Sequence, residues 1–165
     1  MDSQFLLSQQ LGEALLEKGW VLSTAESCTG GGVAAAITDV AGSSAWFDRA
    51  YITYSNQAKV DMLGVRQETL ESAGAVSESV VTEMVVGVLE RSNASIAVSI
   101  SGVAGPGGGT VEKPVGTVCF GFASSDGWLS TETCVWQGDR KQIREQAVEH
   151  ALRSLLSFLT RKSYE

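Results

Sequence analysis

The sequence is poor in positive charge. Its 165 residues carry 12 lysines and arginines against 19 aspartates and glutamates, a formal net charge of -7, and no block of basic residues. Sequence-independent binding of DNA or RNA needs a positive field that displaces counterions from the phosphates. The composition therefore argues against a nucleic-acid partner. It leaves room for a small anionic substrate, because one or two local cations are enough to hold such a molecule.

Long apolar runs and a secretory leader are also missing. No run approaches the ~18 residues of a membrane span, and the N-terminal stretch MDSQFLLSQQLGEALL has no basic start and soon turns polar. The three cysteines, Cys28, Cys119 and Cys134, are odd in number and lack CxxC spacing, which favours reduced thiols over disulfides. These features predict a cytoplasmic protein with no membrane partner.

Histidine is limited to a single residue, His150. A Ser-His-Asp triad is nearly excluded by this count, because His150 lies midway along a predicted helix, one step off its apolar stripe, where a solvated helix face is expected. Zinc sites use cysteines and histidines at close spacing, whereas the single histidine and the three cysteines of this chain are scattered along the sequence. The loops expected to carry the chemistry hold no cluster of carboxylates. The sequence therefore predicts that no metal is bound.

Hydrophobic periodicity predicts one domain, residues 1–165, in which helices and strands alternate. This order is typical of an α/β fold, a layered α/β/α sandwich with a mixed, mostly parallel central sheet. Helices are expected over 3–18, 31–38, 56–63 and 78–91 and from 140 onward, with Asp139 and Gln142 as a capping box, and strands over 20–25, 49–54, 94–102, 117–124 and 128–136.

Three loops follow predicted strands, at residues 26–32, 54–59 and 101–109. Open α/β sheets collect ligands at such loops, so we expect the three to converge on one edge of the sheet. The third loop, SGVAGPGGG, matches neither a P-loop nor a dinucleotide fingerprint. It is either a flexible crossover or a wall of backbone N–H groups that a substrate approaches closely.

The first of these loops, within STAESCTGGG, places hydroxyls and a thiol just before three glycines. A hydroxyl attacks only if a base takes its proton, and lysine is the alternative to histidine. Lys59 lies in the first turn of the helix after YITYSN, where the helix dipole is unfavourable for a cation. To be mostly neutral at pH 7, its pKa must fall by about 3 units, which burial can supply. The alternative is an exposed first-turn lysine.

Six ordered motifs carry a family resemblance: TAESCTGG, GSSAWF, YITYSNQAK, GAVSE, SISGVAGPGGG with KPVGTV, and GDR. From about residue 7 to 156, the chain resembles the C-terminal domain of the competence-damage-inducible CinA family, in particular its stand-alone bacterial form. The resemblance implies hydrolysis of the carboxamide of nicotinamide mononucleotide (NMN), in the recycling of pyridine nucleotides. It also implies a metal-independent mechanism without a cofactor, in which Ser27 is the nucleophile and Lys59 the base.

Further site residues follow on this basis. Tyr54 is expected to hydrogen-bond Ser27 or Lys59, or to stack on the pyridine ring. Arg140 and Arg144 are candidates for the substrate phosphate, unless they form a solvated face. The remaining expected substrate-binding residues are Cys28, Thr29 and Gly30, whose region offers backbone N–H groups to an oxyanion, the pocket residues Ser101 and Gly102, and Glu26, which alternatively hydrogen-bonds the loop.

Three alternatives stay open. Cys28 adjoins Ser27, and a thiol is intrinsically the better nucleophile, although the resemblance favours serine. The domain is alternatively a non-catalytic nucleotide-binding or regulatory module, or an amidase acting on another small amide. A homo-oligomer, a dimer or higher, is also expected, both from the family and because Trp46 and Phe47 are read as exposed aromatics near the site.

Overall fold

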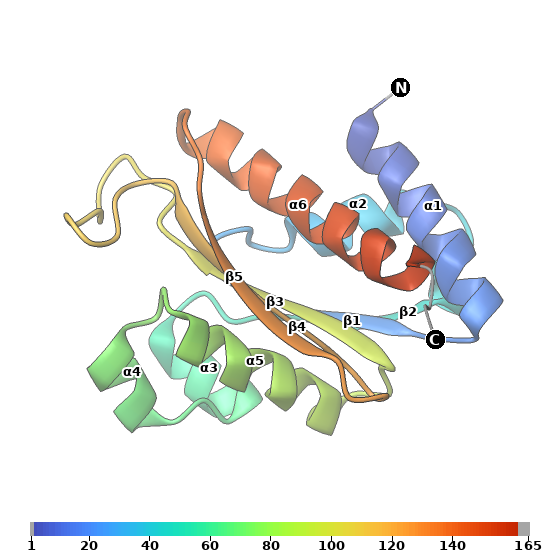
Figure 1. Cartoon of the computed structure of the whole chain (residues 1–165), viewed down its shortest axis with the longest axis horizontal. Coiled ribbons are helices and arrows are strands. Elements are labelled where there is room, and N and C mark those ends of the chain that lie inside the picture. The colour runs from blue at the N-terminus through green and yellow to red at the C-terminus, as the bar shows by residue number, and fades with distance from the viewer. Residues whose placement is uncertain (1, 162–165) are drawn as a thin grey trace.

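A five-stranded sheet lies between two layers of helices in the computed structural model, which describes residues 2–161 (Figure 1). Helices α1, α2 and α6 cover one face, and α3, α4 and α5 cover the other. This arrangement confirms the predicted α/β/α sandwich. The helices are α1 (Ser3–Lys18), α2 (Gly32–Thr38), α3 (Asn56–Leu63), α4 (Gln67–Ala73), α5 (Glu78–Arg91) and α6 (Arg140–Thr160), with a 3-10 turn η1 (Ser43–Ala45).

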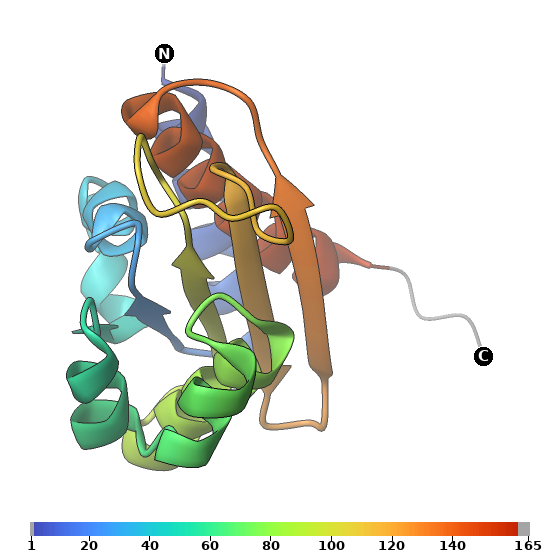
Figure 2. The ribbon, with the colours of Figure 1, turned by 90° about the vertical axis from the view of Figure 1, so that its left-hand side faces the viewer.

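The strands run in the order β2-β1-β3-β4-β5 and form a mixed sheet. Strands β2, β1 and β3 are parallel, and β4 is antiparallel to both of its neighbours. Figure 2 shows the β4–β5 hairpin and the long yellow loop that leaves β3. The bounds are β1 (Leu22–Glu26), β2 (Phe47–Ile52), β3 (Ile96–Gly102), β4 (Thr117–Ser124) and β5 (Leu129–Val135).

Burial explains why the central strands read as nearly continuous small or apolar runs. Every residue of β1 and β4 is buried, and so is all of β3 except its last residue. Strands covered by helices on both faces have no solvated side that polar residues need to occupy. Edge strand β5 instead mixes exposed and half-buried positions. Because β2, β1 and β3 are parallel, their carboxyl-terminal ends lie at the same end of the sheet. The loops that follow these three strands therefore start close together.

Local capping sets where the site-bearing helices begin. The Ser55 hydroxyl accepts a hydrogen bond from the Ala58 amide at 3.0 Å, which fixes the start of α3. At α6, the Asp139 carboxylate and the Gln142 side chain form the predicted capping box. These two caps place Lys59 and Arg140 in the first turns of their helices.

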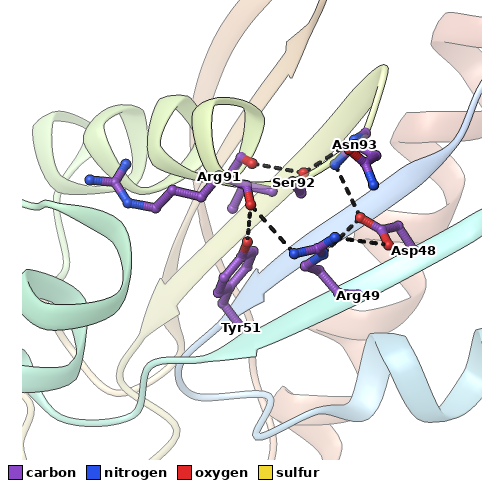
Figure 3. Close-up of polar contacts among 8 residues, drawn as sticks. Asp48, Arg49, Tyr51, Arg91, Ser92 and Asn93 are labelled. Carbon is purple, nitrogen blue, oxygen red and sulfur yellow. Dashed lines mark hydrogen bonds and ion pairs between the residues drawn. The ribbon is translucent and has the colours of Figure 1, made fainter.

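The end of α5 is tied to edge strand β2 by polar contacts (Figure 3). The Tyr51 hydroxyl donates to the Arg91 carbonyl at 3.0 Å, and the Asn93 amide donates to the Asp48 carboxylate at 3.1 Å. Asp48 also accepts from Arg49 at 2.8 Å. These contacts hold β2 in place, and the loop that follows β2 carries the residues around Tyr54.

Three features differ from the sequence-based expectation. Helix α4 was not predicted, because its sequence QETLESA buries only Leu70 and shows no apolar stripe. Trp46 is not an exposed aromatic: it is 2% exposed, and a Cβ on Gly12 of α1 would lie 2.5 Å from its ring. His150 is half-buried rather than on a solvated helix face. Among residues 2–161, no helix combines the length and the apolar character needed to cross a membrane.

Candidate active site

The three predicted loops line one pocket of about 340 Å³ at the edge of the sheet. A volume of this size suits a small-molecule ligand. Their convergence, expected from the parallel strand ends, is thereby confirmed. The lining residues are Ser27 and Cys28 from the first loop, Tyr54, Asn56 and Lys59 from the second, Ala75 and Val76 from the turn before α5, Ser101–Ala104, Gly105, Gly107 and Gly108 from the third, and Arg140 from α6.

Ser27 is held at the end of β1 by both neighbouring strands. Its amide donates to the Ile100 carbonyl of β3 at 3.0 Å, while the Thr53 amide donates to the Glu26 carbonyl at 3.0 Å. The hydroxyl of Ser27 donates to the Tyr54 carbonyl at 3.3 Å. The sheet thus fixes the backbone of the serine, and its side chain turns toward the loop after β2.

Lys59 lies against Ser27. The distance from Lys59 Nζ to Ser27 Oγ is 3.1 Å, and the amine also donates to the carbonyls of Thr53 at 2.8 Å and Tyr54 at 3.4 Å. The lysine is 1% exposed, so the alternative of an exposed first-turn lysine is wrong. Within residues 2–161, no carboxylate forms an ion pair with it.

Burial lowers the pKa of Lys59 below its ordinary value of 10.5, because a charged amine loses hydration there. A negative charge on Cys28, present only when its thiol is ionised, has a smaller, opposite effect on this pKa. The same burial raises the pKa of the Cys28 thiol to about 11. Cys28 is 6% exposed and is part of the hydrophobic core beneath α1, α2 and α6. At neutral pH this cysteine is a protonated thiol, and the thiolate is the reactive form. Its environment therefore disfavours it as the nucleophile.

The side chain of Glu26 holds the first loop and the start of α2 together by hydrogen bonds. Its fully buried carboxylate accepts hydrogen bonds from the hydroxyls of Thr24 at 3.2 Å and Thr29 at 2.8 Å. It also accepts from the amides of Val33 at 2.9 Å and Ala34 at 3.0 Å, in the first turn of α2. A negative charge in this position stabilises a helix N-terminus. These contacts match the alternative in which Glu26 hydrogen-bonds the loop, and Glu26 does not line the pocket.

Arg140 and Tyr54 lie together at the pocket. One Arg140 nitrogen donates to the Gly105 carbonyl at 2.7 Å, and another donates to the Tyr54 hydroxyl at 3.1 Å. The Tyr54 ring is largely exposed, at 61%. Tyr54 was expected to hydrogen-bond Ser27 or Lys59, and its backbone carbonyl accepts hydrogen bonds from both. Its phenol oxygen instead accepts from Arg140.

Arg144, one turn further along α6, points to the other side of the loop. Its guanidinium donates to the carbonyls of Cys28 at 3.0 Å and Thr29 at 3.2 Å. Arg144, Thr29 and Gly32 line a separate surface hollow, away from Ser27. Gly30, at φ +59°, lies beside Arg144, and its amide donates to the Ser27 carbonyl at 3.0 Å. The backbone amides of Cys28 and Thr29 donate no hydrogen bond within the described residues.

Ser101 and Gly102 line the pocket as expected, and a Cβ on Gly102 would lie 2.9 Å from the Thr117 carbonyl. Sequence reasoning missed Asn56, Ala75 and Val76 as lining residues. Ala75 and Val76 belong to the motif GAVSE, so that motif was the available signal. Asn56 is the first residue of α3 and follows its cap, Ser55.

Comparison with known proteins identifies relatives that match more than nine-tenths of the chain. The family described as "CinA C-terminal domain" matches residues 5–159. A nicotinamide-nucleotide amidohydrolase PncC from Enterobacter agglomerans is 57% identical over 150 residues, covering 91% of this chain and 92% of that protein. The PncC protein of Escherichia coli K12 is 56% identical over 155 residues, covering 93% and 94%. A CinA-like protein of Chlorobaculum tepidum is 52% identical, but the match spans only 37% of its length.

Solved structures agree in fold. The crystal structure of the competence/damage inducible protein CihA from Agrobacterium tumefaciens superposes with a TM-score of 0.94 at 42% identity, covering 98% of both chains. The competence damage-inducible protein A of Klebsiella pneumoniae gives a TM-score of 0.93 at 40% identity, covering 98% of this chain and all of that one.

Proposed function

Because the chain belongs to the CinA C-terminal domain family, we propose that it hydrolyses the carboxamide of NMN to nicotinate mononucleotide and ammonia, with Ser27 as nucleophile and Lys59 as base. The chain is an enzyme, a hydrolase: relatives at 56–57% identity over more than nine-tenths of both chains are nicotinamide-nucleotide amidohydrolases. The substrate and the roles of individual residues are the proposed steps. The role in pyridine-nucleotide recycling rests on the same substrate.

The observation that carries the proposal is the buried pair of Lys59 Nζ and Ser27 Oγ, 3.1 Å apart. A neutral amine has two N–H donors and one lone pair. The neighbours of Lys59 Nζ are two carbonyls, which only accept, and one hydroxyl, which also donates. The Ser27 hydroxyl has a single proton, which faces either the Tyr54 carbonyl at 3.3 Å or the amine. When that proton turns to the lone pair of the neutral amine, the two N–H groups of Lys59 face the carbonyls of Thr53 and Tyr54, and all three neighbours are satisfied.

The chemistry proceeds in two halves. Ser27 Oγ attacks the carboxamide carbon while its proton passes to Lys59 Nζ, and the resulting ammonium donates that proton as the C–N bond breaks and ammonia leaves. The nicotinoyl ester on Ser27 is then attacked by water, whose proton passes to Lys59. Collapse returns that proton to Ser27 Oγ and releases the carboxylic acid, which loses its remaining proton to solvent or to the departed ammonia, so that the enzyme is regenerated.

An oxyanion forms in both halves and needs hydrogen-bond donors. The amides of Cys28 and Thr29, which directly follow the nucleophile and have no partner among the described residues, are the proposed donors. Arg144, which binds the carbonyls of the same two residues, is the proposed support of this loop. Fixed donors of this kind stabilise developing charge without reorganising during the reaction.

Arg140 is the proposed partner of the substrate phosphate. Its guanidinium lies in the pocket and is bonded to neutral oxygens of Gly105 and Tyr54 rather than to a carboxylate. No carboxylate therefore compensates its positive charge, which is available to an anion. A guanidinium also forms bidentate hydrogen bonds with two phosphate oxygens. Tyr54, whose exposed ring lies beside it, is the proposed stacking surface for the pyridine.

The test is ammonia release from NMN, nicotinamide and nicotinamide riboside by the wild type, three single variants and one double variant. Ser27→Ala and Lys59→Ala are expected to lower kcat for NMN by about 10³-fold or more each, and the double variant by little more than either. Cys28→Ala, the matched control, keeps most of the activity. Loss of activity in Cys28→Ala alone would assign the thiol as nucleophile. Binding of NMN without ammonia release by the wild type would indicate a non-catalytic module.

A further inference from the structure

A second group of reactive side chains lies outside the pocket, between the edge strand β5 and helix α6. Glu132 and Cys134 are two residues apart on β5, so their side chains share one face of the strand. His150 Nε2, from the middle of α6, lies 2.5 Å from the Glu132 carboxylate and 3.8 Å from Cys134 Sγ. All three ligand atoms lie within 4.8 Å of one another. None of the three residues lines the pocket that contains Ser27.

Aromatic rings fix the direction of the histidine. The His150 ring packs at 4.8 Å from the Phe120 ring and at 5.4 Å, edge to face, from the Trp136 ring. This packing directs Nε2 toward β5. The imidazole is therefore already held in position. A ligand that binds it does not have to bear the entropic cost of ordering the ring.

The cluster is open to solvent on one side. The side chains of His150 and Glu132 are 27% and 42% exposed, and Cys134 is a half-buried free thiol. His150 also lines a surface hollow together with Ser154 and Arg153. The Arg153 guanidinium is paired with Glu149 at 2.7 Å, so its charge is partly compensated. An ion has a route to the three donor atoms from this side.

We propose that Glu132, Cys134 and His150 bind one Zn²⁺ ion, with water as the fourth ligand. Thiolate, imidazole and carboxylate are the donors that zinc uses in proteins, and the two softer ones select against Mg²⁺ and Ca²⁺. On binding, the Cys134 thiol releases its proton to solvent and His150 coordinates as a neutral ring through Nε2. The thiolate and the carboxylate then balance the two charges of the metal.

The donor atoms already lie within 4.8 Å of one another, and a zinc ion requires them to move to its own ligand separations. Tetrahedral zinc with bonds of about 2.0–2.3 Å needs nitrogen and sulfur ligands about 3.6 Å apart and nitrogen and oxygen ligands about 3.3 Å apart. The present nitrogen–sulfur separation is 3.8 Å. The nitrogen–oxygen contact is a hydrogen bond of 2.5 Å and has to open, which a rotation of the half-exposed Glu132 side chain allows. The metal would link β5, a strand with one neighbour in the sheet, to α6.

The experiment uses metal-stripped protein titrated with Co²⁺ as a spectroscopic probe and then with Zn²⁺. One equivalent of Co²⁺ is expected to give a thiolate-to-metal charge-transfer band and the visible bands of tetrahedral cobalt, and Zn²⁺ displaces both. Cys134→Ser abolishes the charge-transfer band, and His150→Gln and Glu132→Gln each weaken binding at least tenfold. Cys119→Ser is the matched control, because that buried thiol lies on the neighbouring strand β4 and keeps the three ligands.

Thermal melts of the same proteins give a second readout. Zn²⁺ is expected to raise the Tm of the wild type and of Cys119→Ser, because a ligand that binds only the folded state stabilises it, and to leave that of Cys134→Ser unchanged. Absence of the cobalt bands in the folded wild type, bands that persist in Cys134→Ser, or bands lost in Cys119→Ser would overturn the proposal. These readouts do not depend on ammonia release, so they stand apart from the proposed reaction.

Discussion

A single buried amine gives the site its chemical character. No carboxylate among the described residues forms an ion pair with Lys59. The three polar partners of its amine are two backbone carbonyls and the Ser27 hydroxyl. Removing a charged amine from water without a counter-ion is costly, and the group responds by a lower pKa. The same burial that disfavours the protonated form of Lys59 leaves a larger fraction of the amine unprotonated, and so available as a base, at a given pH.

This cost predicts a pH-dependent difference in stability. In the unfolded chain Lys59 titrates near 10.5, and in the fold its pKa is lower. Between the two values the unfolded state binds more protons, so the free energy of unfolding rises with pH across that window; below it the full penalty of burying the charge applies. Lys59→Met removes this term. The unfolding free energy of the wild type relative to Lys59→Met is therefore expected to increase from pH 6 to 9.5 in denaturant titrations, and a constant difference would contradict it.

Two arginines of one helix are expected to behave differently. Arg140→Gln removes the cation in the pocket, so kcat/KM for NMN should fall by about tenfold or more relative to nicotinamide riboside, which lacks the phosphate. Arg144→Gln is the matched change one turn along α6. Because Arg144 binds loop carbonyls, this variant should lower kcat for both substrates and leave their ratio unchanged. A change of ratio with Arg144→Gln alone would reverse the two roles.

At the scale of elements, most helices and strands can be predicted from the sequence. Which segments pack against one another cannot be predicted from it. The strands at Thr117–Ser124 and Ile96–Gly102 and the capped start of α6 follow from local patterns that those residues themselves contain. Helix α4 shows no such pattern, because only Leu70 contacts the core. Trp46 was misread because its environment is a space left by Gly12 on α1, 34 positions earlier, which no local pattern indicates.

The candidate site divides in the same way. Ser27 and Lys59 could be proposed from motif and chemistry, and the parallel strand ends bring them together. The contacts of Glu26, Arg140 and Arg144 depend on the direction in which each side chain points, which the sequence does not give. The Glu132–Cys134–His150 cluster is invisible to spacing rules, because a strand supplies two ligands and a helix the third. The cobalt titration also tests the sequence-based prediction that the protein binds no metal.

Helix α2 depends on a carboxylate outside it. Glu26→Gln replaces an acceptor-only group that serves two amides and two hydroxyls, so at least one donor loses its partner. We expect a loss of about 2 kcal/mol in the free energy of unfolding and a fall in kcat, because Ser27 directly follows Glu26. Glu13→Gln, on the exposed side of α1, is the control and should change neither quantity in urea titrations and ammonia assays. Equal effects of the two changes would refute this role.

At the scale of the whole molecule, the family match over residues 5–159 and the solved relatives place the entire described sheet and its helices within one fold. The cytoplasmic location stays a prediction. So does self-association, and Trp46 no longer supports it because it is buried. Exposed apolar side chains remain on the edge strand β2 and on α3, the helix that contacts it: Ile52 and Met62 are each 40% exposed.

These residues predict an oligomer that forms at the β2 edge. Light scattering should give a mass of at least twice the 17.4 kDa of one chain. Met62→Glu introduces a charge into the exposed apolar surface and should shift the mass toward that of one chain, whereas Val111→Glu, at a fully exposed loop position far along the chain, should not. A wild type of one-chain mass across the micromolar range would contradict the expectation.

The central claim, that Lys59 is a base because it is neutral when the substrate arrives, is tested most directly by titrating its side-chain nitrogen by NMR in ¹⁵N-lysine-labelled protein, with Lys59→Met to assign the signal. The account predicts a midpoint clearly below 10.5, so that the amine is unprotonated in a measurable fraction of molecules at assay pH. A midpoint at or above 10.5 would leave Ser27 without its proton acceptor.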